Sequence, residues 1–377
     1  MQRLPGLDLL RAVAIVWVML YHARVAGLGK TIDSVSFWGW MGVDLFFVLS
    51  GFLIGSQLFK PLAQGEKLAL GAFYLRRALR ILPAYLVVVA LYFSWPPLRE
   101  TPEIQPLWQF LTFTENLFID FFHPKAFSHV WSLCVEEHFY LVVPLLTLLL
   151  MRRPAWWKTM ALLLGLLIGG MLLRSAIWLN GLQPLLGVEE GVGNFWQRYM
   201  EWIYYPTYTR LDGLLAGVSL ALVATFRPSW WAGWQRRANL LLVAGLVAMW
   251  GAFALFQERE SFAATVAGFP LLSLGLGLIV ASAASPQSLL SRWQVPGAAL
   301  LATLAYSLYL THKAAYRLVR TEIGPWLKLH DGYAVLCYGA AALLAGVLLY
   351  LAVERPALRW RDRLWASRRA NLAPQAG

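Results

Sequence analysis

The sequence predicts an all-α membrane protein, a polytopic bundle of about ten transmembrane helices. Of the 377 residues, 59% are hydrophobic and only 14% are charged, whereas a soluble domain carries about 25% charged residues. The apolar residues occur in long runs, and a run of roughly 20 such residues can cross the hydrocarbon core as a helix. The 19 tryptophans and 15 tyrosines agree with this class, because these side chains collect at membrane interfaces.

Ten apolar runs predict the membrane-spanning helices in order. They cover residues 6–25, 37–59, 81–95, 128–150, 159–180, 206–226, 239–256, 262–283, 297–318 and 331–352. The third run is short, and the weaker stretch at 106–122 is expected to lie at the interface or to re-enter the membrane. The first run is too long for the core of a signal peptide, so we expect it to remain as the first span.

The distribution of lysine and arginine predicts that both termini are cytoplasmic. With the N-terminus inside, the cytoplasmic segments hold 19 of these residues and the opposite segments hold 7, and cytoplasmic loops of membrane proteins carry such an excess. We expect residues 357–377 to form a basic cytoplasmic tail. The net charge of +12 sits mostly in short gaps between apolar runs, so no nucleic acid partner is expected.

Several common site types are absent from the sequence. Cys134 and Cys337, the only cysteines, lie inside apolar runs, so no disulfide framework is expected. No spacing typical of metal ligands, no phosphate-binding loop and no dinucleotide fingerprint occurs. We therefore expect neither a metal site nor a tightly bound cofactor.

Ionisable side chains inside the predicted spans are the strongest functional signal. Apart from Asp8 and Arg24 at the ends of the first span, they are Arg11, His22, Asp44, Glu136, Glu137, His138, Arg174, Arg210, Asp212, His312, Lys313 and Arg317. A helical rise of about 1.5 Å per residue places nearly all of them in the outer half of the membrane. Charge in hydrocarbon costs a few kcal/mol, so each needs a partner or a function. Pairing between helices explains single residues, whereas an outward-facing polar cavity explains their gathering in one half.

Arg11 and His22 lie on the first predicted span with ten residues between them. Eleven positions are about three helical turns, so both side chains are expected on roughly one face. Taken alone, the pair is more typical of an anchoring arginine and an interfacial histidine.

Further motifs follow this pair in a defined order. They are MGVDLFFVLSGFLIG (41–55), FYLRRALRILP (73–83), HVWSLCVEEHFYLVVP (129–144), RLDGLLAGVSLA (210–221), YSLYLTHKAAY (306–316) and VERP (353–356). Together they resemble the membrane acyltransferases of acyltransferase family 3, from Arg3 to about Pro356, so residues 1–356 are expected to form the acyltransferase domain. That family includes inner-membrane O-acetyltransferases that act on cell-surface polysaccharide.

The resemblance implies an acyl-CoA donor and a set of site residues. The essential Arg–x10–His pair of the family corresponds to Arg11 and His22. Its Trp-Ser-Leu…Glu segment and its arginine motif correspond to Trp131, Ser132, Leu133, Glu136, Arg76, Arg77 and Arg80. The family commonly has Gln where this chain has His138, and the simplest interpretation is a hydrogen-bonding substitute for the amide.

Acyl transfer to a hydroxyl group needs a base and a group that stabilises the oxyanion. His22 is the best candidate base, because imidazole titrates nearest to neutral pH. Glu136 is expected either to orient His22 or to pair with Arg210. Residues expected to bind substrate or support the site are Asp44, Ser132, Trp131, His129, Arg210, Asp212 and His312.

The arginine motif predicts where the donor binds. Arg76, Arg77 and Arg80 suit the phosphates of coenzyme A, although the same cluster also suits anionic lipid. The chain is expected to cross the inner (cytoplasmic) membrane. The expected donor is acyl-CoA, acetyl-CoA by resemblance, and the expected acceptor is a carbohydrate, a lipid-linked sugar or another envelope or secreted molecule. The alternative function is a secondary transporter or lipid-linked sugar flippase. Transporters usually place polar groups near the midplane and use inverted repeats, and no repeat is evident here.

Overall fold

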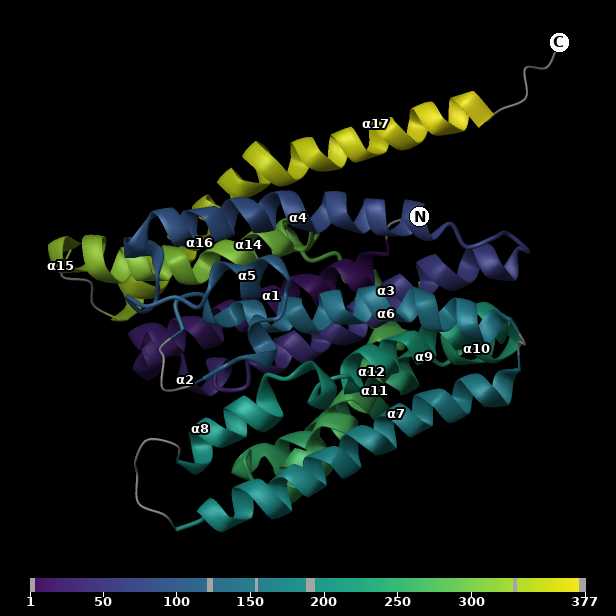
Figure 1. Cartoon of the computed structure of the whole chain (residues 1–377), viewed down its shortest axis with the longest axis horizontal. Coiled ribbons are helices and arrows are strands. Elements are labelled where there is room, and N and C mark those ends of the chain that lie inside the picture. Colours follow the sequence, from purple (N-terminus) through teal and green to yellow (C-terminus); the bar gives the residue numbers. More distant parts are fainter. Residues whose placement is uncertain (1–3, 121–124, 153–154, 188–193, 328–330, 373–377) are drawn as a thin grey trace. The chain divides into compact units, whose positions relative to one another are not determined.

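The computed structural model describes residues 4–120, 125–152, 155–187, 194–327 and 331–372. Every regular element in these ranges is a helix (Figure 1), so the predicted all-α class is confirmed. The chain divides into two compact units. The first comprises Met1–Val18, Trp38–Leu68 and Glu103–Ala302, and the second comprises Met19–Phe37, Ala69–Pro102 and Thr303–Gly377.

The first unit holds most of the helices. They are α3 (Met41–Ala63), α5 (Leu107–Leu111), α6 (Trp131–Met151), α7 (Trp156–Ile177), α8 (Phe195–Tyr199), α9 (Asp212–Phe226), α10 (Pro228–Arg236), α11 (Ala238–Leu255), α12 (Phe269–Ala283) and α13 (Leu289–Arg292). Of the predicted stretch 106–122, the described residues 106–120 contain the five residues of α5 and a single 3₁₀ turn, Glu115–Leu117. In the described part of this stretch there is thus no spanning helix, as expected.

The second unit is smaller and shares two helices with the first. Its own helices are α2 (Gly29–Ser36), α4 (Leu70–Ser94), α15 (Gly324–Leu327), α16 (Asp331–Leu349) and α17 (Arg355–Leu372). Helix α1 (Pro5–Ala23) ends in this unit, and helix α14 (Ala298–Leu318) begins in the first unit and continues into this one. Both shared helices carry candidate site residues.

Eight helices of the described ranges are long and apolar enough to cross a membrane. They are Pro5–Leu28, Met41–Ala63, Leu70–Ser94, Ser128–Met151, Trp156–Leu185, Ala238–Glu258, Ala264–Ala283 and Tyr333–Ala366. A ninth candidate is the pair α9 and α10, which is bent by 109°. Helix α14 occupies the remaining predicted span but is not among the eight. His312, Lys313 and Arg317 in its second half make it too polar.

Helix α4 begins much earlier than the predicted third span. The apolar run predicts 81–95, whereas the helix covers Leu70–Ser94. Hydropathy places the start of a span after the last charged residue, but a helix requires only that its backbone hydrogen bonds form. The three arginines of the motif are therefore helical, and their side chains project from α4.

Glycines bring α3 and α9 into close contact in the core of the first unit. A Cβ atom on Gly51 would lie 2.2 Å from the carbonyl oxygen of Leu214, and one on Gly217 would lie 2.2 Å from that of Val48. Small residues four positions apart allow membrane helices to approach closely. The glycines of two sequence motifs therefore serve helix packing.

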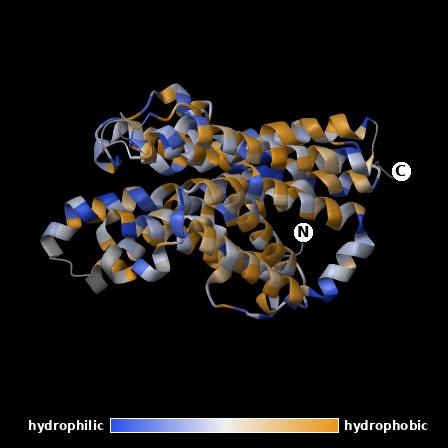
Figure 2. Cartoon of the chain, turned by 90° about the horizontal axis from the view of Figure 1, so that it is seen from below, coloured by the Kyte–Doolittle hydropathy of each residue, from blue (hydrophilic) through white to orange (hydrophobic). Residues whose placement is uncertain are grey.

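The outer helices of the first unit present apolar side chains to their surroundings. Figure 2 shows apolar residues along most helices. In the most apolar stretch of the span that includes α7, only 6% of the residues are buried. Leu172 on this helix is 65% exposed. On α11, Trp250 is 73% exposed. Such surfaces are stable in lipid but not in water, so the structure has the character of a multi-pass membrane protein.

Candidate active site

His22 and His312 meet within the second unit. His22 lies in the last turn of α1 and His312 lies in α14, 290 positions further along the chain. The distance from Nδ1 of His22 to Nε2 of His312 is 2.7 Å, and the ring centroids are 4.9 Å apart. Both residues are predicted site residues, but sequence reasoning did not predict that they pair. The residue spacing of two distant helices carries no signal for that contact.

Two backbone carbonyls of α14 determine the tautomer of His312. Its Nδ1 lies 3.0 Å from the carbonyl oxygen of Leu308 and 2.9 Å from that of Tyr309. A carbonyl oxygen only accepts hydrogen bonds, so Nδ1 of His312 carries a proton. When both rings are neutral, the other nitrogen of His312 is an acceptor, and Nδ1 of His22 then donates to Nε2 of His312. In that neutral arrangement Nε2 of His22 carries no proton, which is the form that a general base requires.

A small cavity opens beside this histidine pair. Its volume is about 160 Å³. It is lined by His22, Val25, Ala26, Glu100, Lys313, Tyr316, Arg317 and Arg320. Lys313 and Glu100 form an ion pair in its wall, and the hydroxyl group of Tyr316 donates to the carbonyl oxygen of Met19 over 3.1 Å. The candidate base thus faces a polar space large enough for part of a substrate.

Arg11 lies on the same helix as His22, as predicted, but in the other unit. Its Nη1 is 3.3 Å from Oδ1 of Asp8, one turn earlier on α1. Helix α1 passes from the first unit to the second between Val18 and Met19. The catalytic role of Arg11 stays a prediction that rests on the family motif.

The first unit contains a buried cluster of two ion pairs. Nη2 of Arg210 is 2.8 Å from Oδ1 of Asp44. Arg174 makes a bidentate contact with Asp212, with distances of 2.7 and 3.0 Å. All four side chains are at most 6% exposed. Two cations and two anions balance each other, and pairing of this kind is the structural explanation for charge inside the membrane.

Aromatic rings surround the guanidinium group of Arg210. Its Cζ lies 4.3 Å from the ring centroid of Phe269, 4.5 Å from that of Tyr204 and 5.2 Å from that of Trp131. Contacts between a cation and aromatic faces are worth roughly 0.5–2 kcal/mol, more when water is excluded. Arg210 and Trp131 therefore belong to one packed structure, and a substrate role for this cluster stays a prediction.

Glu136 has two hydroxyl partners in the first unit. Ser50 donates to Oε1 over 2.8 Å and Tyr140 donates to Oε2 over 2.9 Å. The proposed action of Glu136 on His22 stays a prediction, because the two residues belong to different units. At the start of the same segment, Ser132 donates to the carbonyl oxygen of the buried His129.

The arginine motif has neighbours in the second unit that sequence reasoning missed. Cζ of Arg76 lies 4.8 Å from the ring centroid of Trp365 on α17. Arg80 lies close enough to the buried Glu354 to interact with its carboxylate, and Ser307 donates to Oε2 of Glu354 over 2.6 Å. The motif therefore contacts an aromatic ring and a carboxylate of its own unit.

The sequence of the chain matches the model of a known protein family. The model of the acyltransferase domain of acyltransferase family 3 matches residues 4–352. The chain belongs to acyltransferase family 3.

Curated members of acyltransferase family 3 resemble the chain at moderate identity. Peptidoglycan O-acetyltransferase OatA of Listeria monocytogenes is 31% identical over 327 residues, which are 82% of this chain and 48% of the relative. O-acetyltransferase OatA of Staphylococcus aureus is 26% identical over 336 residues, 82% of this chain and 50% of the relative. The chain thus spans about half the length of these curated relatives. No solved structure gives a significant match.

His138 has a side-chain partner, and its interpretation as a substitute for the amide stays a prediction. Nδ1 of His138 is 2.7 Å from Oγ1 of Thr207 in the first unit. This contact agrees with the interpretation of His138 as a substitute for the amide.

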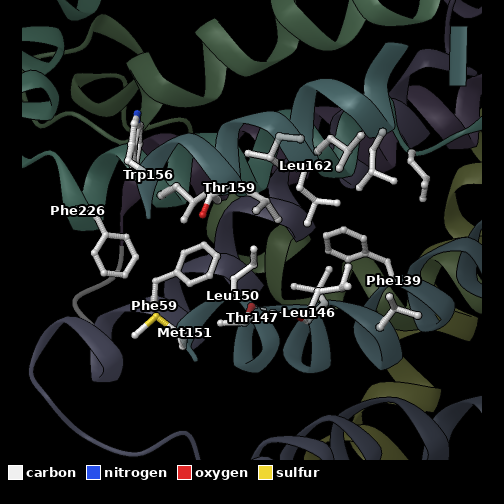
Figure 3. A pocket seen from close by; sticks show the side chains of 18 of the residues that line it. Phe59, Phe139, Leu146, Thr147, Leu150, Met151, Trp156, Thr159, Leu162 and Phe226 are labelled. Carbon is white, nitrogen blue, oxygen red and sulfur yellow. Dashed lines mark hydrogen bonds between the residues drawn. The ribbon is translucent and has the colours of Figure 1, made fainter. Parts of the chain in front are cut away.

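A mostly apolar groove lies in the first unit, with His138 and Arg227 among its lining residues. Figure 3 shows side chains of α6 and α7 facing one another across it, among them Leu146 and Leu162. Its volume is about 460 Å³, and its lining is almost entirely hydrocarbon. None of the predicted site residues is part of the lining that the structure describes. The lining is mostly apolar, and it also includes the hydrogen-bonded pair His138 and Thr207.

Proposed function

We propose that this member of acyltransferase family 3 is an O-acetyltransferase of the cytoplasmic membrane. It transfers an acetyl group from acyl-CoA to a hydroxyl group of a carbohydrate or lipid-linked sugar of the cell envelope. Its relatives include a protein named as a peptidoglycan O-acetyltransferase, and this name supports the reaction and the acceptor class. The observation that carries the mechanism is the contact between His22 and His312 beside a polar cavity.

The tautomer derived for the pair supports a direct transfer. Nε2 of His22 takes the proton of the acceptor hydroxyl while its oxygen attacks the thioester carbonyl. The carbon–sulfur bond then breaks, and the imidazolium of His22 returns the proton to the thiolate of coenzyme A. Nε2 of His312 accepts a hydrogen bond from Nδ1 of His22 throughout, which stabilises the transient positive charge. The products are an acetyl ester and free coenzyme A, and no acyl-enzyme is required.

The donor is proposed to bind from the cytoplasm at the arginine motif. The lysine and arginine distribution predicts that the start of α4 lies on that side. Guanidinium groups bind phosphate with two parallel hydrogen bonds. Replacing Arg76, Arg77 and Arg80 with glutamine is expected to raise the KM for acetyl-CoA. An unchanged KM would mean that these arginines only contact anionic lipid.

The transfer is tested by following thiol release from acetyl-CoA with oligosaccharide fragments of peptidoglycan as the acceptor. The purified wild-type protein is expected to release coenzyme A only when the acceptor is present. His22→Ala is expected to abolish release while its elution profile in detergent stays that of the wild type. His138→Gln is the matched control, because it also removes an intramembrane imidazole.

Two outcomes separate the proposal from its rivals. Full activity in the His22→Ala variant would remove the catalytic assignment. Movement of an intact substrate across a membrane without thiol release would instead indicate a transporter or flippase.

A further inference from the structure

Three cations form a stripe in the second unit, two on α14 (Lys313 and Arg317) and one, Arg320, on the π-helical turn Val319–Ile323 that continues it. Lys313, Arg317 and Arg320 occupy positions i, i+4 and i+7, which share one helical face. All three line the cavity beside His22. Like charges at such spacings destabilise a helix by a few tenths of a kcal/mol per pair. The stripe therefore needs a negative group to balance it.

The described lining does not supply enough negative charge. Glu100 is the acidic residue of this lining, and it pairs with Lys313. Arg317 and Arg320 remain as the excess charge. The Nε of Arg317 is buried and has no hydrogen-bond partner among the residues that the structure describes.

The cluster of the first unit shows how this chain treats charge that serves packing alone. There Arg210 and Arg174 each have a carboxylate partner at 2.8 Å or less, and the cluster is neutral. The cavity beside His22 differs from it, because it opens a space lined by more cations than anions. Walls of one sign concentrate field lines and attract an oppositely charged ligand.

We propose that this cavity binds an anionic group of the acceptor, a carboxylate or a phosphate, and that Arg317 and Arg320 pair with it. The inference rests on the proposed function, since it places the acceptor against His22. Arginine suits both anions, because its planar fork matches their oxygens. An acceptor whose anionic group pairs with the arginines holds its hydroxyl group at a fixed position relative to Nε2 of His22. A neutral acceptor lacks this ion pair.

The test compares acceptors that differ only in charge. One pair is a glycan fragment with a sugar carboxylate and its primary amide, and the other is a fragment with a terminal phosphate and its dephosphorylated form. The wild type is expected to use one or both anionic members with at least tenfold higher kcat/KM than the neutral partner. The pair that shows the larger ratio identifies the anion. Equal kcat/KM within both pairs would overturn the inference.

Two variants tie this preference to the arginines. The double variant Arg317→Gln/Arg320→Gln is expected to lower kcat/KM for the anionic acceptor by about 10- to 100-fold, the range for lost charged hydrogen bonds, and to bring the ratio close to one. Arg359→Gln on the exposed face of α17 is the control and should keep the wild-type ratio. A double variant that retains the preference would overturn the assignment.

Direct binding distinguishes failure of this inference from failure of the proposed function. Thermophoresis without donor measures the Kd of the same fragments for the wild type and the double variant. A charge preference that the double variant loses, without transfer to any acceptor, would support the anion site and contradict acetyl transfer. Acetyl transfer with no charge preference in binding or kinetics would support the proposed function and contradict the anion site.

Discussion

The ion pair between Asp44 and Arg210 offers a test of whether this buried charge serves packing or the reaction. Asp44→Asn leaves a guanidinium without its carboxylate, and Arg210→Met leaves a carboxylate without its guanidinium. The double variant Asp44→Asn/Arg210→Met removes both charges. The two side chains are 4% and 1% exposed, so water cannot replace a missing partner.

The magnitude follows from the geometry of the pair. A nitrogen–oxygen distance of 2.8 Å places the charge centres about 4 Å apart, where an effective dielectric constant of about 20 gives roughly 4 kcal/mol. Each single variant is expected to lose about 3–5 kcal/mol, since it leaves an uncompensated buried charge. The double variant is expected to lose less than either, chiefly the contacts of Arg210 with its aromatic neighbours, at roughly 0.5–2 kcal/mol each.

The assay is thermal unfolding in detergent, followed by tryptophan fluorescence, with acetyl transfer measured on the same samples. Unfolding of a chain with two units is not expected to be two-state, so the order of the midpoints is compared. The reasoning predicts that both single variants unfold at lower temperature than the double variant. A double variant that is less stable than either single variant would refute it. A stable double variant without transfer activity would instead assign the pair to the substrate site.

Three further outcomes follow from the packing and the hydrogen bonds. Gly217→Ala should lower the thermal midpoint by an amount equivalent to about 1–3 kcal/mol, the usual cost of overpacking. A Cβ atom at Gly165 would meet nothing within 4 Å, so the thermal midpoint of Gly165→Ala should equal or exceed that of the wild type. His312→Phe should lower kcat about 10²-fold with little change in the KM for acetyl-CoA, and unchanged kcat would exclude a role in orienting the base. His138→Gln should keep the thermal midpoint of the wild type. His138→Leu should lose about 0.5–1.5 kcal/mol of stability, because it removes the hydrogen bond to Thr207. Equal thermal midpoints of the two variants would contradict that hydrogen bond.

Apolar runs were sufficient to predict where most helices lie, because burial in hydrocarbon requires about 20 consecutive apolar residues whatever the neighbours are. They were weakest where polar side chains enter a helix. The start of α4 was placed too late, and α14 is less apolar than its predicted span implies. A backbone can stay helical through charged residues when other elements satisfy their side chains, and hydropathy does not record that.

For the candidate site too, the sequence predicted some features and the tertiary structure decided others. Motif order along the chain was sufficient to recognise acyltransferase family 3 and to select His22, Asp44 and Arg210, because these signals are local in sequence. Partner choice was decided by the tertiary structure. The contact of His22 with His312 and that of Asp44 with Arg210 span 290 and 166 positions, and each depends on how separate helices pack. A single sequence specifies which side chains need partners, whereas only the packed helices determine which partner each one meets.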